Sequence, residues 1–377
     1  MAGVYVHIPF CQHKCNYCNF FSVASVKYRD IFVDALLKEI KERHNYLEGE
    51  KVNTVYFGGG TPSLLKTKEI NRILDTLKRY LTFDYEPEIT LEANPDDLDY
   101  EKILQIKNET PVNRLSIGLQ SFFDDDLRYL DRIHTSDDAI KAVENVLKAG
   151  FNNVTVDLIY GIPGLTVEKW KKNLDIFFGF DIPHLSSYSL TVEPKTALEY
   201  QINKRKRVEP DEEISVKHFE VLMEETAKRG YIHYEISNFA KEGYYSKHNS
   251  IYWLGGHYLG LGPSAHSFNG KSRQWNVASI SSYVTAEKVD KIISEREILT
   301  KTQRFNEYIM TSLRTNYGVD IEHMENVFGK IYKNYFLQNI NTFIISKKVL
   351  QHGNRFILTN AGKLFADGIA ADLFMEE

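Results

Sequence analysis

The chain has 377 residues, of which 43% are hydrophobic and 26% are charged, and its formal net charge is -5 at pH 7. This is an ordinary composition for a globular protein, and the length allows one large domain plus a smaller one. No basic surface argues for nucleic acid, no run reaches the roughly 18 apolar residues of a membrane span, and no secretion signal is recognisable, so we expect a cytoplasmic protein.

The first two-thirds of the chain alternate short apolar segments with longer amphipathic ones. The apolar segments are β-branched or aromatic and are bounded by Gly, Pro or Asn, which predicts six strands, at residues 4–8, 54–57, 88–92, 114–118, 153–158 and 184–190. Helical spacing of apolar residues predicts six helices, at residues 28–46, 67–80, 99–107, 137–149, 167–179 and 211–229. Such alternation forms parallel units with right-handed crossovers, so we predict an α/β fold, a partial (β/α)6 barrel with its chemistry at the carboxyl ends of the strands.

The last part of the chain follows a different pattern. It predicts helices at residues 303–315, 320–328 and 332–345, a short hairpin over 349–358 and a last helix from 359 to 374. Helices followed by a two-stranded wing resemble a winged-helix module, and no dense basic cluster there points to DNA. We therefore expect a barrel over residues 1–235, a connecting segment over 236–297 and a mainly helical, winged-helix-like C-terminal module over 298–377.

All three cysteines of the chain, Cys11, Cys15 and Cys18, lie within eight residues. Thiolates on one short loop can converge on one metal centre, and the spacing Cys-x3-Cys-x2-Cys leaves one iron of a four-iron cluster without a cysteine. The thiolates could instead hold zinc together with His13 or His7, although structural zinc usually takes two cysteine knuckles and only one is present. A disulfide is disfavoured because the number of cysteines is odd and no signal peptide is recognisable.

Two further motifs end the second and third predicted strands. Gly59, Gly60 and Thr61 lie in a GGGTP segment, and consecutive glycines let backbone N–H and C=O groups approach a ligand closely. Glu92 ends the third strand, where a carboxylate could bind a cofactor. The simpler interpretation is that Glu92 is an acid at a helix N-terminus. The two aspartates at positions 96 and 97 fill that role better.

Polar residues also follow the fourth predicted strand and lie within the fifth. Gln120 can hydrogen-bond a ribose, and the planar guanidinium of Arg132 suits a carboxylate. Asp157 stands in an apolar strand, where an unpaired carboxylate is costly, so it needs a partner such as a ribose hydroxyl. A lone buried aspartate is more often structural, but the position of Asp157 at the barrel mouth favours a ligand.

These motifs occur together, and in this order, in one known family. The cysteine loop is the signature of radical S-adenosylmethionine (SAM) proteins, and VYVHIPFC, GGGTP, LEANP, GLQSF, DLIYGIPG, HNSIYW and GLGPSAH resemble the coproporphyrinogen III oxidase-like family over nearly the whole chain. Within that family the chain most resembles the HemW haem-chaperone branch. The resemblance implies a radical SAM barrel and a [4Fe–4S] cluster ligated by Cys11, Cys15 and Cys18.

The resemblance also assigns residues to SAM. Family positions that contact SAM match Tyr5, Gly59, Gly60, Thr61, Glu92, Gln120, Arg132 and Asp157, and the aromatic position that packs near the adenine matches Tyr17. In the family the glycine segment contacts the methionine amino group.

Two departures separate the chain from the decarboxylating enzymes of the family. Those enzymes carry a fourth cysteine two residues after the third, where this chain has Phe20, and a long extension before the first strand, where this chain has only a few residues. The His-Asn-x-x-Tyr-Trp stretch is instead typical of the chaperone branch and is linked there to haem.

Histidines in and after that stretch are the candidate haem ligands. His248 is the residue that we predict to ligate haem iron, and His266 is a poorer second. Tyr252 and Trp253 could stack on the flat macrocycle. Without the resemblance, the simpler interpretation of His248 is a hydrogen-bonded loop histidine.

We therefore expect a radical SAM-type protein that binds haem as cargo and delivers it to recipient haemoproteins, with a reductant protein as a further partner. SAM and the cluster would then support assembly or release rather than substrate oxidation. The main alternative is an oxygen-independent coproporphyrinogen III oxidase, which removes CO₂ from propionate groups during haem biosynthesis. A radical SAM enzyme that methylates and opens the haem ring is a third interpretation.

Overall fold

Six neighbouring parallel strands form the centre of the protein. The structure, a computed structural model, describes residues 1–25 and 27–376. The six strands agree with the predicted ones to within a few residues: β1 (Ala2–Ile8), β2 (Val52–Gly59), β3 (Phe83–Ala93), β4 (Arg114–Gln120), β5 (Val154–Tyr160) and β6 (His184–Ser189). Most of their residues are buried on both faces, which is the usual condition of a parallel sheet.

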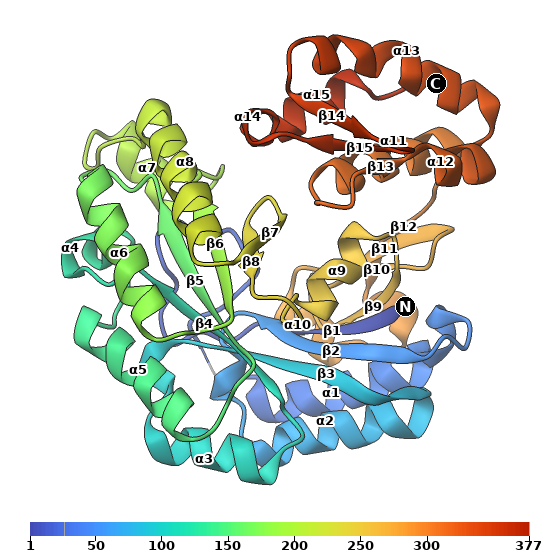
Figure 1. The fold of residues 1–377 in the computed structure, drawn as a ribbon. Coiled ribbons are helices and arrows are strands. Elements are labelled where there is room, and N and C mark those ends of the chain that lie inside the picture. Colours follow the sequence, from blue (N-terminus) through green and yellow to red (C-terminus); the bar gives the residue numbers. More distant parts are fainter. Residues whose placement is uncertain (26, 377) are drawn as a thin grey trace.

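Helices cover the outer side of this curved sheet (Figure 1). The six predicted helices are present: α1 (Arg29–Arg43), α2 (Thr67–Tyr80), α3 (Tyr100–Glu109), α5 (Ser136–Lys148), α6 (Val167–Gly179) and α8 (Glu212–Lys228). The connections add shorter pieces: α4 (Asp124–Tyr129), α7 (Ala197–Asn203), η1 (His44–Leu47), η2 (Pro62–Leu64), η3 (Pro95–Asp97) and η4 (Val289–Lys291). Helix α2 shows the physical reason for the agreement, because Ile70, Ile73 and Leu77 recur at helical spacing and are all buried. No helix in the described residues is long and apolar enough to cross a membrane.

The segment expected to connect the two domains extends the sheet at both ends. Its elements, with the strand before it, are β7 (Ile232–Glu235), β8 (Asn238–Ala240), α9 (Lys247–Trp253), β9 (His257–Leu261), β10 (His266–Phe268), β11 (Ser272–Asn276), α10 (Ile280–Thr285) and β12 (Ile293–Ile298). The strand order is β12-β11-β10-β9-β1-β2-β3-β4-β5-β6-β8-β7, with β9 parallel to β1 and β8 antiparallel to β6. The barrel is therefore open. These strands were not predicted because they have only three to six residues each, too few to show a clear period.

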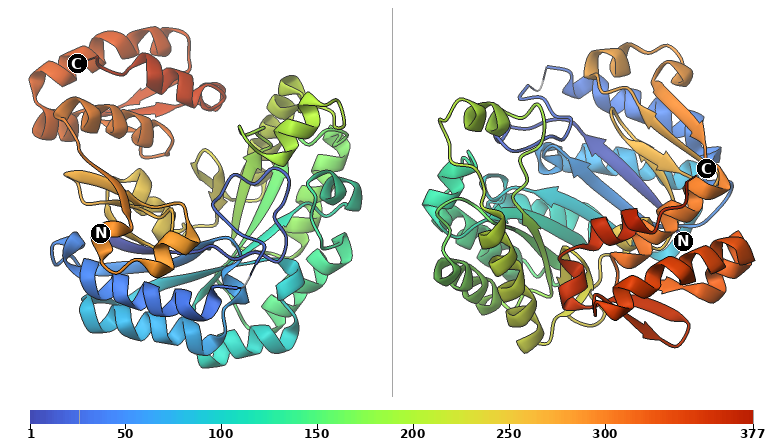
Figure 2. Two further views of the ribbon diagram at one scale, coloured as in Figure 1. Left: turned by 180° about the vertical axis from the view of Figure 1, so that it is seen from behind. Right: turned by 90° about the horizontal axis from the view of Figure 1, so that it is seen from above.

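The C-terminal module has a hydrophobic core of its own. Its elements are α11 (Lys301–Leu313), β13 (Val319–Asp320), α12 (Ile321–Phe328), α13 (Lys330–Ile345), β14 (Val349–His352), β15 (Arg355–Leu358), α14 (Asn360–Lys363) and α15 (Ala366–Asp372). The strands form a second sheet in the order β13-β15-β14. Figure 2 shows the module next to α9 and the β10–β12 end of the large sheet. The predicted fold class, a partial barrel with a mainly helical C-terminal module, is confirmed.

The prediction of one continuous last helix is wrong. The segment forms two short helices, α14 and α15, because the chain tightens at Phe365. The N–H of Phe365 donates to the oxygen of Gly362 at 2.9 Å, three residues back, and Phe365 itself has φ -124° and ψ 22°. Helical geometry is lost at this residue, so the chain changes direction there.

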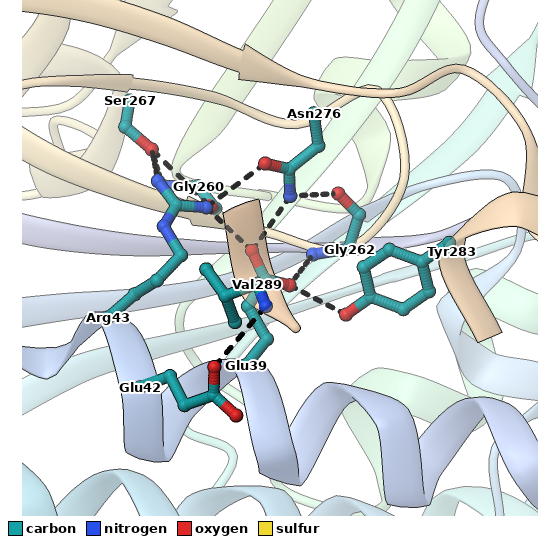
Figure 3. A network of polar contacts seen from close by, with 9 residues as sticks. All are labelled: Glu39, Glu42, Arg43, Gly260, Gly262, Ser267, Asn276, Tyr283 and Val289. Atoms are coloured by element: carbon teal, nitrogen blue, oxygen red, sulfur yellow. Dashed lines mark hydrogen bonds and ion pairs between the residues drawn. The ribbon is translucent and has the colours of Figure 1, made fainter. Parts of the chain in front are cut away.

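Hydrogen bonds around a buried ion pair within α1 join this helix to the end of the sheet built by β9–β11 (Figure 3). Arg43 donates to Glu39 Oε1 at 2.6 Å, and the two side chains are 4% and 1% exposed. Glu39 also accepts hydrogen bonds from Asn276 Nδ2 (2.7 Å), the Tyr283 hydroxyl (2.6 Å) and Gly262 N–H (2.8 Å). The Glu39 carboxylate thus accepts four hydrogen bonds, one of them from the Arg43 cation. These bonds offset the loss of hydration that a buried charge suffers.

Replacing Arg43 with Ala should therefore destabilise the protein strongly. The change leaves the Glu39 carboxylate buried without its cation, which costs about 3–5 kcal/mol of unfolding free energy. Urea unfolding followed by circular dichroism measures it. The matched control is Arg72→Ala, because Arg72 pairs with Asp34 at 2.7 Å while both side chains are exposed (51% and 67%), and that loss should stay below about 1 kcal/mol. Equal losses in the two variants would contradict the role given to the buried pair.

Candidate cofactor site at the barrel mouth

A cavity of about 400 Å³ lies at the carboxyl ends of the parallel strands, within the usual range of about 300–1,000 Å³ for ligand pockets. Many of the residues singled out in the sequence line it: Tyr17, Cys18, Gly59, Gly60, Glu92, Gln120, Arg132 and Asp157. They come from several different strands and loops. They meet because the carboxyl ends of parallel strands share one edge of the sheet.

The cysteine loop leaves the end of β1 and has a fixed base. Cys11 N–H donates to the oxygen of Val23 at 3.1 Å, and Val23 N–H donates to the oxygen of Pro9 at 2.7 Å. Further along, the Asn16 side chain donates to the oxygen of Tyr129 at 2.9 Å, which ties the loop to the barrel. All three cysteines are free and half-buried, so the loop holds three thiols beside the cavity.

The glycine segment holds the start of this loop in place through backbone hydrogen bonds. Gly60 N–H donates to the oxygen of Ile8 at 2.8 Å, and Thr61 N–H donates to the oxygen of Phe10 at 2.7 Å. Gly59 has φ +107°, which favours glycine, and a Cβ added to Gly60 would lie 2.5 Å from the Phe10 carbonyl oxygen. The close backbone approach that we expected toward a ligand therefore also holds the cysteine loop.

Two carboxyl groups face the cavity from β3 and β5. Glu92 accepts hydrogen bonds from the Tyr56 hydroxyl at 2.7 Å and from Gly59 N–H at 3.1 Å. Burial raises the pKa of Glu92 to about 7 and the pKa of Asp157 to about 6, because the ionised forms lose contact with water. A cationic ligand would favour the ionised forms, and carboxyl groups perturbed in this way mark a candidate site.

Arg132 links the cavity to the cysteine loop. Its guanidinium donates to Asn94 Oδ1 and to the oxygen of Gly118, both at 2.8 Å, and to Cys15 Sγ at 3.5 Å. Gln120, at the end of β4, has φ +69°, next to a register shift between β4 and β5. A left-handed conformation costs energy in a residue other than glycine, and such strain collects at functional sites.

Arg114 is a cavity residue that sequence reasoning missed. It is 1% exposed, and within the described residues its Nε and Nη2 atoms have no hydrogen-bond partner. A buried guanidinium without partners is costly, although Glu92 and Asp157 lie near enough to interact with its charge. An arginine at the first position of an otherwise apolar strand was the signal that could have revealed it. Tyr188 and Asn249, also on the cavity wall, carried no comparable signal.

Four other predicted contacts or ligands do not line the cavity: Tyr5, Thr61, Cys11 and Cys15. The Tyr5 hydroxyl is hydrogen-bonded to His7 Nδ1 at 3.2 Å, and its ring stacks on Tyr56 at a centroid distance of 6.1 Å. Thr61 accepts a hydrogen bond from Asn94 Nδ2 at 3.0 Å. Tyr5 and Thr61 thus support residues that line the wall.

His248 lies in the core and is 1% exposed. Its Nδ1 is hydrogen-bonded to Thr54 Oγ1 at 2.7 Å and its Nε2 to the Tyr252 hydroxyl at 2.9 Å. Both ring nitrogens are engaged, as in the simpler interpretation of this residue, and ligation of haem iron by His248 stays a prediction. His266 is exposed and its ring stacks on Trp275 at 5.6 Å.

The zinc interpretation uses His13 or His7 as a further ligand, and both have other partners in the structure. His13 pairs with Asp131 at 3.0 Å, and His7 Nε2 is hydrogen-bonded to the oxygen of Phe21 at 2.8 Å.

Comparisons with known proteins show the family of the chain. The chain matches the Radical SAM superfamily over residues 5–176 and the HemN C-terminal domain over residues 299–365. It is 35% identical to the heme chaperone HemW of Lactococcus lactis over 363 residues, which cover 96% of this chain and 94% of that protein. The chain belongs to the HemW family. The HemW protein of Bacillus subtilis is 34% identical over 385 residues, which cover 98% of each chain.

A solved structure shares the fold of this HemW-family protein. Coproporphyrinogen III oxidase (HemN) from Escherichia coli, described as a radical SAM enzyme, superimposes with a TM-score of 0.84 over 99% of this chain and 90% of that one. The identity is 22%, so the likeness shows the fold alone. The predicted resemblance to the HemW branch is confirmed, and radical SAM membership implies a [4Fe–4S] cluster and SAM.

Replacing Gly60 with Ala should disturb the cysteine loop. The added Cβ would meet the backbone of Phe10 at 2.5 Å and push the start of the loop away, and overpacking of this kind costs about 1–3 kcal/mol. We expect less iron and sulfide per chain after anaerobic reconstitution, together with a lower unfolding free energy. Gly179→Ala is the control, because a Cβ there would have no atom of the described residues within 4 Å apart from its chain neighbours and the backbone of its own helix. Full iron loading of the Gly60 variant would contradict the seating role.

Proposed function

We propose that this protein is a radical SAM-type haem chaperone that binds SAM and haem and delivers haem to haemoproteins. The similarity to proteins named heme chaperone HemW carries the proposal, because it runs through the barrel, α9 and the C-terminal module alike. We place its action in the cytoplasm, with a reductant protein and recipient haemoproteins as partners. The absence of a membrane-spanning helix in the described residues agrees with that setting.

Three thiols on one anchored loop suit a [4Fe–4S] cluster. We propose that Cys11, Cys15 and Cys18 hold the cluster and leave one iron open. Burial raises the pKa of the Cys11 and Cys18 thiols, so it disfavours their thiolate forms. The positive charge of bound iron would stabilise these thiolates.

The cavity beside the loop suits SAM, which carries a sulfonium, an amino group and a carboxylate. We propose that Glu92 and Asp157 bind its cationic and hydroxyl groups, that Arg132 and Arg114 offer guanidinium groups to its carboxylate, and that Gln120 contacts the ribose. When bound, the cluster and SAM together supply one-electron chemistry at the open iron. The protein's own part is to orient SAM against the loop and to keep water out.

Oxygen-independent coproporphyrinogen III oxidase is the second candidate function. The match to the HemN C-terminal domain over residues 299–365 favours it. Phe20 disfavours it, since this residue stands where the decarboxylating enzymes carry a fourth cysteine. In the structure Phe20 is 60% exposed and lines the rim of the cavity, where it offers an apolar surface in place of a thiol.

The deciding experiment uses the full, cluster-loaded chain under anaerobic conditions. We expect it to bind haem with a defined stoichiometry and to transfer it to apomyoglobin, a convenient acceptor. With SAM, reductant and coproporphyrinogen III, mass spectrometry should show no loss of CO₂. Failure to bind haem would overturn the chaperone function, and conversion to protoporphyrinogen would establish the second candidate.

The affinity for SAM should rise with pH. Glu92 has a raised pKa of about 7, so at pH 6 about nine-tenths of it is protonated and cannot attract a cation. We expect binding to be up to about tenfold weaker at pH 6 than at pH 7.5, measured by equilibrium dialysis with labelled SAM. Glu92→Gln should reduce the dependence to about twofold, the part that Asp157 with its pKa of about 6 still contributes, whereas Glu193→Gln, at the same cavity, should keep the full dependence. A flat profile in the unmodified protein would refute the role given to Glu92.

A further inference from the structure

A second cavity, of about 540 Å³, lies between α9 with β9–β11 and the C-terminal module. Much of its wall is aromatic: Tyr252, Trp253, Tyr258, Phe268, Tyr308, Tyr317 and Phe328. Its volume is typical of ligand pockets, and its aromatic lining suits a flat, largely apolar ligand. None of the contacts proposed for SAM belongs to this wall.

The cavity also contains one arginine that is not neutralised. Arg273 pairs with Glu307 at 2.7 Å and Arg355 pairs with Asp320 at 3.6 Å. Arg304 has no ion pair in the part of the chain that the structure describes, and its Nε is buried without a hydrogen-bond partner. A buried N–H that lacks an acceptor costs about 1–3 kcal/mol, and a carboxylate would satisfy it.

Apolar side chains remain exposed around the same cavity. Leu254, Met310, Tyr317 and Val327 are between 40% and 45% exposed, and all four line it. The indole N–H of Trp253 is buried and has no acceptor among the described residues. Exposed apolar groups gathered at one hollow mark a binding site rather than a solvated surface.

A histidine stands free on the wall of this cavity. His323, on α12, is exposed, and its ring nitrogens have no hydrogen bond within the described residues. Its ring lies 5.1 Å from that of Tyr308. His248, by contrast, lies behind the wall with both nitrogens engaged and holds the hydroxyl of Tyr252. Neutral imidazole with a free nitrogen is a common ligand of haem iron.

We propose that haem binds in this second cavity, with a propionate on Arg304, the iron on His323 and the macrocycle against Tyr252 and Trp253. His248 is then a positioning residue, which fixes the ring of Tyr252 from behind. This inference rests on the proposed chaperone function and adds the place of the cargo. It makes the C-terminal module one wall of the haem site.

The test is a titration of the cluster-loaded full chain with haem, haem dimethyl ester or iron-free protoporphyrin IX. Binding is monitored by the Soret band and by tryptophan fluorescence. Arg304→Gln should weaken haem binding about tenfold and leave binding of the ester, which lacks the propionate charges, unchanged. His323→Ala should change the Soret and electron paramagnetic resonance spectra of bound haem and weaken its binding, while protoporphyrin IX binds as before. His248→Ala should weaken haem and protoporphyrin IX alike without changing the iron spectrum.

Arg72→Gln and His352→Ala, both at exposed positions, serve as matched controls and should bind haem as the unmodified protein does. Unmodified haem affinity and spectra in both the Arg304 and His323 variants would overturn the site while leaving the chaperone function intact. A His248→Ala variant that alone loses the histidine spectrum of the iron would also overturn it. Absence of haem binding by the unmodified chain would instead refute the proposed function itself.

Discussion

Parallel pairing of β1 to β6 is the constraint on which the rest of the structure depends. Side chains from positions as distant as Gly59 and Asp157 meet in one cavity because all six strands point the same way and end at one edge. The buried pair of Glu39 and Arg43 then joins α1 to the strands added beside β1. The cysteine loop depends on the strand pairing, since it starts where β1 ends and is held by the glycine segment that ends β2.

The cofactor cavity holds charge that the protein alone does not compensate. Glu92 and Asp157 have raised pKa values because they are buried, and Arg114 keeps two guanidinium nitrogens without acceptors among the described residues. Each of these costs stability in the empty protein, and a ligand with charges of both signs would offset the cost. A zwitterionic ligand, such as the SAM that we propose, would therefore suit this cavity better than a neutral one.

A continuous set of contacts joins the two cavities. The Tyr56 hydroxyl donates to Glu92 at the first cavity, and the Tyr56 ring stacks on His248 at a centroid distance of 5.0 Å. His248 is hydrogen-bonded in turn to Tyr252, on the wall of the second cavity. The motif that the sequence linked to haem thus stands between the proposed SAM and haem sites, with its histidine inside the core.

The sequence by itself determined the parallel α/β barrel, its six strands and helices, the cysteine loop and the carboxylates at the strand ends, because periodicity and motif spacing are local properties. Only the tertiary structure decided which side chains are free. Arg304 carries no local motif, and the short strands β8 and β9 join the sheet by pairing with β6 and β1, which lie far away in the chain. His248 is engaged on both nitrogens by residues far along the chain or a helical turn away. Burial and hydrogen-bond satisfaction depend on neighbours that folding brings together, so no local pattern could reveal them.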